Sequence, residues 1–161
     1  MSEVAQNSNR NEGLIVDIGG LSVQERLAQI ESPYHIEDDV RKLLSQRPPL
    51  TTEKTSIPFH TRWISKFKFE SKFDVGDVLN ALQAEGYPRF PLGAGLYLID
   101  AHTNWLGNNF LIAMEPVLNE EGHPVIFGVG QKYSGLRVLY AVRTDRHLTG
   151  ISGILFPEKK V

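Results

Sequence analysis

The sequence predicts an α+β fold, in which N-terminal helices and one further helix pack on a mainly antiparallel β-meander. The first half of the chain carries helix-start signals followed by apolar residues at helical spacing. The second half consists of short apolar segments separated by Gly, Asn and Asp turns. The connections between these segments are too short for the crossover helices that a parallel sheet requires.

The N-terminal part predicts a short strand and two helices. The apolar run 14–18, closed by two glycines, is typical of an edge strand or a tether. Ser22 and Glu25 form a capping box, which predicts a helix over 23–31. A second helix is expected to begin at the Ser-Pro pair 32–33, because proline is favoured at the first helical position.

A strand and the clearest helix follow. Period-two alternation over 62–69 predicts an amphipathic strand with Trp63 on one face and Lys66 and Lys68 on the basic outer face. Asp74 is the expected N-cap of a helix, because its carboxylate can accept the first free backbone N–H groups.

Five short strands make up the rest of the chain. Pro116 lies inside the second of them and either shortens it or places it at a sheet edge. The expected ranges are 95–100, 109–118, 125–130, 136–144 and 148–156.

Length and composition favour a single globular domain. The chain has 161 residues, of which 41% are hydrophobic and 22% charged, and one domain usually takes about 100–200 residues. We expect a flexible polar arm over 1–13 and one α+β domain over 14–161. No apolar run reaches the roughly 18 residues of a membrane-spanning helix, and the N-terminus lacks the apolar core of a secretory signal. A cytoplasmic location and no membrane partner are therefore expected.

The near-neutral net charge of −2 is an average over oppositely charged segments. Segments 54–72 and 132–146 are mainly basic, whereas 37–39 and 115–121 are acidic. Such asymmetry suits complementary contacts between protein subunits, and a nucleic acid is the alternative partner. The candidate binding residues of the basic strand are Trp63, Lys66 and Lys68.

Several kinds of chemistry are excluded or lack a motif. Without cysteine, the chain has no disulfide, thiolate metal site or cysteine nucleophile. The five histidines form no His-X-His or His-Glu-X-X-His unit, so neither a metal site nor a cofactor is predicted. Residues 16–20 resemble the phosphate-binding opening of actin-like sugar kinases. The resemblance covers only five residues, and the chain is too short for the two-lobed fold of that family.

One alternative function is cleavage of phosphodiesters. The unit 147–149 resembles the His-X-Thr unit of two-histidine phosphoesterases, and the element order resembles that of small metal-independent ribonucleases. Their chemistry needs a base for the 2′-hydroxyl, an acid for the leaving oxygen and cations for the phosphorane charge. The catalytic candidates that this resemblance implies are His147, Arg137, Arg143 and Glu115.

A second alternative is binding of a small ligand. Helices that precede most of a curved sheet resemble the element order of proteins similar to nuclear transport factor 2, whose conical fold encloses an apolar pocket. Asp100 and His102 lie two residues apart at the end of a predicted strand, so both side chains would point into that pocket as a carboxylate–imidazole pair.

The main hypothesis is a non-enzymatic binding or assembly module. The sequence holds no complete catalytic constellation, and its aromatic and cationic strand offers a binding face. We expect a homo-oligomer or a stable protein partner, as for a subunit of a bacterial or phage complex.

Overall fold

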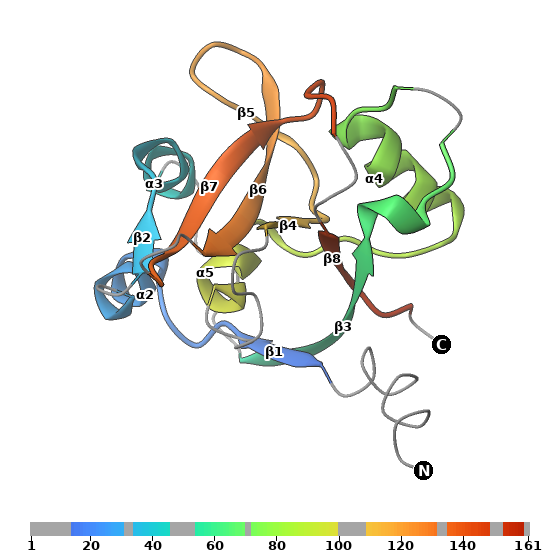
Figure 1. Ribbon diagram of the computed structural model, residues 1–161. Helices are drawn as coiled ribbons and strands as arrows, with labels where there is room; N and C mark the ends of the chain where they lie inside the picture. The colour runs from blue at the N-terminus through green and yellow to red at the C-terminus, as the bar shows by residue number, and fades with distance from the viewer. Residues whose placement is uncertain are drawn as a thin grey trace.

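The computed structural model describes residues 14–30, 34–45, 54–69, 72–99, 109–131, 135–148 and 153–159. The predicted polar arm, 1–13, lies outside the described residues. Within them, four α-helices and eight strands form an α+β fold, as predicted. The strands make one curled sheet (Figure 1). The order across it is β1 (Ile15–Ile18), β3 (Thr55–Trp63), β8 (Gly153–Pro157), β4 (Asn109–Ile112), β6 (Pro124–Gln131), β7 (Arg137–Arg143) and β2 (Tyr34–Ile36), with β5 (Val117–Leu118) paired to β6.

The sheet is mixed rather than a simple antiparallel meander. Strand β4 runs parallel to β8 and β2 runs parallel to β7, whereas the other pairs are antiparallel. The C-terminal strand β8 lies between β3 and β4. Every residue of β8 is buried, and a strand that is covered on both faces favours a central position. The predicted meander is therefore matched only in part.

The four α-helices of the described residues surround and fill the curled sheet. Figure 1 shows α2 and α3 beside β2, α4 on the opposite side near β3, and α5 within the curl. The helices are α2 (Val23–Gln29), α3 (Asp38–Ser45), α4 (Val75–Ala84) and α5 (Gly95–Leu98), and two 3-10 turns are η1 (Ile64–Lys66) and η2 (Leu92–Ala94). None of the helices in the described ranges is long and apolar enough to cross a membrane.

The two predicted helix starts at Ser22 and Asp74 are confirmed. The Ser22 hydroxyl accepts the Glu25 N–H at 3.1 Å, and the Glu25 carboxylate accepts the Ser22 N–H at 2.9 Å. Asp74 and Asp77 make the same reciprocal pair at 2.8 and 2.9 Å. Each box satisfies two backbone donors that a helix N-terminus otherwise leaves unpaired.

The second predicted helix begins later than expected. Residues 34–36 form the edge strand β2, and the N–H of Glu37 donates to the Leu139 carbonyl at 3.0 Å. Helix α3 then begins at Asp38. Ile36 is fully buried, so pairing with β7 buries an apolar side chain that a helix turn at this point would not place in the sheet.

The predicted strand over 62–69 is wrong beyond its first two residues. Strand β3 ends at Trp63, which lies opposite Gly153, the first described residue of β8. The chain then turns into η1. Ile64 is fully buried, whereas continued alternation along a strand would place it on the outer face with the lysines.

The predicted strand over 95–100 is also wrong, because α5 occupies most of it. A short apolar run cannot distinguish a buried strand from a buried helix by periodicity. Gly95 permits the helix to approach the sheet closely: a Cβ there would lie 2.8 Å from Leu139 Cδ1 and 3.2 Å from Ile112 Cδ1. Helix α5 thus fills the centre of the curl.

The remaining strands follow the prediction more closely. Strands β6 and β7 coincide with the expected 125–130 and 136–144 to within one residue at each end. Pro116 divides the expected 109–118 strand into β4 and the two-residue β5, and the described part of the last strand begins at Gly153.

Candidate functional site

A surface that we call the cationic–aromatic face follows the end of β3. It begins at Trp63, passes through η1 and reaches the start of α4. Its lysine side chains are exposed, whereas its phenylalanine side chains are half-buried against the core. Its residues are Trp63, Lys66, Phe67, Lys68, Phe69, Lys72 and Phe73.

Stacked rings give this face a fixed base. The rings of Phe67 and Phe69 are 5.8 Å apart with 14° between their planes, and those of Phe69 and Phe73 are 4.4 Å apart at 21°. Trp63 packs on Phe110 at 5.4 Å, yet 42% of Trp63 remains exposed. An exposed aromatic on a fixed base is the kind of residue that anchors protein interfaces.

Arg62 links the cationic–aromatic face to the C-terminal end of α4. Its guanidinium donates two hydrogen bonds to the Glu85 carboxylate, at 2.9 and 3.0 Å, and lies 4.9 Å from the centre of the Phe67 ring. The hydrogen bond from Arg62 lowers the pKa of Glu85. Arg62 is therefore a structural cation, whereas Lys66, Lys68 and Lys72 have no ion-pair partner among the described residues.

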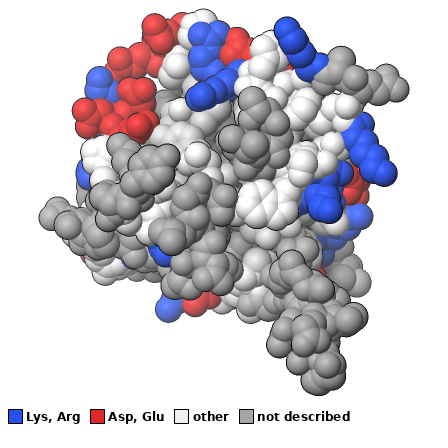
Figure 2. Space-filling model, viewed as in Figure 1, with Lys and Arg blue, Asp and Glu red and all other residues white. Residues whose placement is uncertain are grey.

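An acidic patch lies on another part of the surface. It joins Asp38 and Asp39 of α3 to Glu120 and Glu121 of the turn between β5 and β6. The Lys42 ammonium bridges the two segments at 3.1 Å from Glu120, and this contact raises the pKa of Lys42. In Figure 2 the acidic side chains gather at the upper left, whereas lysines and arginines gather along the right-hand side.

Two of the predicted catalytic cations, Arg137 and Arg143, lie at opposite ends of β7. Six residues of extended chain separate their Cα atoms by about 20 Å. Arg137 donates to the Ile99 carbonyl at 3.0 Å, and Arg143 donates to both oxygens of Asp145 at 2.6 and 3.0 Å. The two guanidiniums are thus held apart, each on its own acceptor.

The other two catalytic candidates, Glu115 and His147, have different neighbours. Glu115 pairs with Arg89 at 3.0 Å. His147 pairs with Asp74 in an isolated bridge, and its Nδ1 lies 3.4 Å from the Phe73 carbonyl, which places the imidazole beside the cationic–aromatic face. No hydrogen bond or ion pair of the described chain joins any two of the four candidates. The predicted pair Asp100 and His102 lies outside the described residues.

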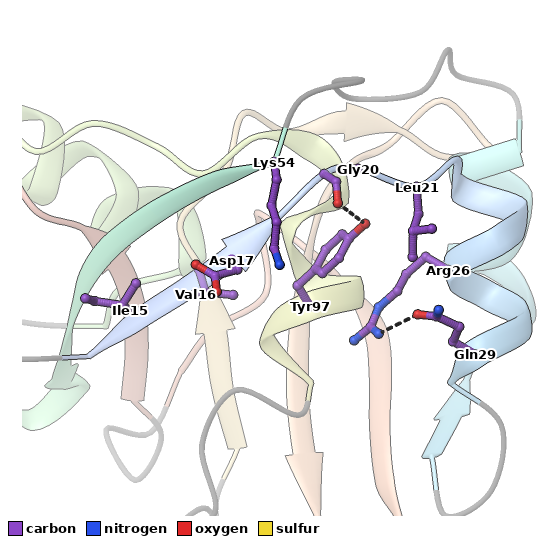
Figure 3. Close-up of a pocket in the computed structure, with 10 residues that line it drawn as sticks. Ile15, Val16, Asp17, Gly20, Leu21, Arg26, Gln29, Lys54 and Tyr97 are labelled. Atoms are coloured by element: carbon purple, nitrogen blue, oxygen red, sulfur yellow. Dashed lines mark hydrogen bonds between the residues drawn. The ribbon is translucent and has the colours of Figure 1, made fainter.

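A cleft that the sequence did not reveal lies beside β1. It has a volume of about 450 Å³ and is bounded by β1, the turn after it, α2, α5 and the residue before β3 (Figure 3). The register of the β1–β3 pair sets Ile18 opposite Thr55, so Lys54 lies next to the turn. Gly19 and Gly20 shape that turn with φ values of 93° and 81°, which disfavour residues with a side chain.

Side chains from three elements converge in this cleft. The Tyr97 hydroxyl of α5 donates to the Gly19 carbonyl at 3.4 Å. Arg26 of α2 donates to the Leu96 carbonyl at 2.9 Å, and its guanidinium lies 4.6 Å from the centre of the Tyr97 ring. Asp17 of β1 accepts a hydrogen bond from the Ser56 hydroxyl. The sequence singled out the glycine pair within residues 16–20 but not the cleft, because Tyr97 and Arg26 are far apart along the chain.

Comparisons with protein-family models, with curated proteins and with solved structures find no significant match to this chain.

Proposed function

We propose that the chain is a non-enzymatic assembly module, in which the cationic–aromatic face of one copy docks on the acidic patch of the next. The observation that carries the proposal is the separation of opposite charges on one molecule (Figure 2). Two acidic segments distant in sequence meet at the Lys42–Glu120 contact, whereas Lys66 and Lys68, which have no ion-pair partner among the described residues, lie in and just after η1.

The residues of the cationic–aromatic face suit a protein interface. Trp63 supplies an exposed ring at its edge, and the stacked phenylalanines hold the lysine-bearing segment in place. Opposite charges on the partner would steer encounter and fix the register, because electrostatic complementarity governs association rate and specificity. A contact between two different faces is heterologous, so it builds a ring or an open chain of subunits.

The test is the mass of the purified protein by light scattering at low and high salt. We expect a mass above the 18.1 kDa of the monomer at 50 mM salt and a shift toward the monomer at 1 M salt, because the Debye length falls to about 3 Å there. The charge-reversed double variant Lys66→Glu/Lys68→Glu should be monomeric at both salt concentrations. A mass of 18.1 kDa for the wild type under all conditions would overturn the proposal.

A charge-swap experiment identifies the partner surface. The variant Glu120→Lys/Glu121→Lys should also be monomeric alone, and a mixture of the two double variants should associate, because each retains one intact face. As a matched control, Lys54→Glu changes an exposed lysine outside the face and should assemble like wild type. If the acidic-patch variant assembles normally, the acidic patch is not the surface on which the second copy docks, and the proposed contact is wrong.

A further inference from the structure

We infer that the cleft beside β1 binds a small organic carboxylate with a planar apolar body. This inference is independent of the proposed assembly, which uses none of the cleft residues. The cleft has a volume of about 450 Å³, which lies within the range of roughly 300–1,000 Å³ that small-molecule sites occupy.

The charges of the cleft select an anion. Lys54 has no hydrogen-bond or ion-pair partner within the described ranges, and Figure 3 shows its ammonium group pointing into the cleft beside Tyr97. Arg26 is already engaged by Leu96 and by Gln29, whose side-chain oxygen accepts at 3.2 Å. Lys54 is therefore the cation available to a ligand.

The same charges favour a carboxylate over a phosphate. Asp17 lies on the cleft wall close to Lys54 in Figure 3, and its carboxylate accepts from Ser56. Together Lys54 and Arg26 exceed Asp17 by one positive charge, which matches a monoanion. A dianion would meet greater repulsion from Asp17 without a second available ammonium group.

A preformed wall favours a planar ligand body. The Tyr97 ring is held at its hydroxyl by Gly19 and on one face by Arg26, and Arg26 is itself fixed on Leu96. A ring that is already ordered costs little further entropy when a ligand packs against it. Ile15 and Leu21 add apolar surface to the lining.

The test titrates the full chain with benzoate, benzyl alcohol and inorganic phosphate at constant ionic strength, followed by amide NMR shifts and by the melting temperature. We expect benzoate to shift the amides of Gly19 and Gly20 saturably and to raise the melting temperature, as a ligand of the folded state does. Benzyl alcohol, which has the ring without the charge, and phosphate, which has the charge without the ring, should leave both unchanged.

Two variants distinguish benzoate binding in the cleft from binding to other cationic parts of the surface. Lys54→Met retains most of the stem of an exposed side chain and should weaken benzoate binding at least tenfold, whereas Lys66→Met, on the cationic–aromatic face, should bind as wild type. Saturable binding that survives Lys54→Met, an equal response to benzyl alcohol, a stronger response to phosphate, or no response to benzoate would each overturn the inference. Assembly of Lys54→Met measured in parallel keeps this result distinct from that of the proposed function.

Discussion

Tyr140 illustrates how a single side chain is placed by its neighbour across the sheet. It lies opposite Gly128 in the β6–β7 pair, and its ring covers the glycine: a Cβ at Gly128 would lie 2.7 Å from Tyr140 Cζ. The missing side chain makes room for the ring, so the tyrosine lies half-buried on the sheet rather than extended into solvent. Burial raises the pKa of Tyr140 to about 12.

This pKa predicts a loss of stability in alkali. Because the folded pKa lies above the unfolded value of about 10, the stabilising contribution is complete below pH 10 and is lost as the pH rises through about 12. The difference of about two units between the folded and unfolded pKa corresponds to about 3 kcal/mol of unfolding free energy. Urea unfolding at pH 9 and pH 12 measures the loss.

The Tyr140→Phe variant serves as the control, because it has no hydroxyl to ionise. We expect its unfolding free energy to fall less than that of wild type between the two pH values. An equal fall in both proteins would assign the alkaline loss to other groups.

At the scale of elements, helix α4 was the most predictable. Its N-cap, its capping box and its buried stripe are all local features of the sequence. The expected strand over 95–100 failed for the opposite reason, since only the curl of the sheet around α5 decides whether that apolar run is helical. Likewise β3 ends at Trp63 and η1 then buries Ile64 completely, which the local alternation does not show.

The cap of α4 can be tested directly. Replacing Asp74 with alanine removes the acceptor for the Asp77 N–H, and loss of an N-cap costs about 1 kcal/mol of stability. Chemical denaturation of Asp74→Ala should therefore show a lower midpoint with an unchanged slope. Asp74→Asn, which retains a capping oxygen, should recover most of the difference, and an equal loss in both variants would contradict the capping role.

At the scale of the whole molecule, the C-terminal strand joins the two halves of the sheet. Strand β8 pairs with β3 on one side and with β4 on the other, and all of its residues are buried. Its removal would expose both neighbouring strands and open the core between them.

Truncation tests this arrangement. A chain that ends at Ser152 should lack a cooperative unfolding transition and near-ultraviolet circular dichroism, because the central strand is missing. A chain that ends at Lys159 retains β8 and should unfold like the full chain. A folded product from the shorter chain would show that β8 is dispensable.

The candidate sites also differ in how far the sequence predicts them. The sequence singled out Trp63, Lys66 and Lys68, which the structure distributes over the end of β3, η1 and the segment after it. The acidic segments were also visible in the sequence, but their meeting at Lys42 and Glu120 depends on how α3 lies beside the β5–β6 turn. The cleft beside β1 was not foreseen, because Tyr97 comes from a helix that had been expected to be a strand.

The sequence by itself determined the α+β class, the capped helices and strands β6 and β7, since capping, helical spacing and short turns act between residues close along the chain. The tertiary structure alone decided the central place of β8, the helical form of α5, the separation of Arg137 from Arg143 and the convergence of Lys54, Arg26 and Tyr97. These features depend on which distant segments share buried surface, a free energy that belongs to the assembled core and to no single segment.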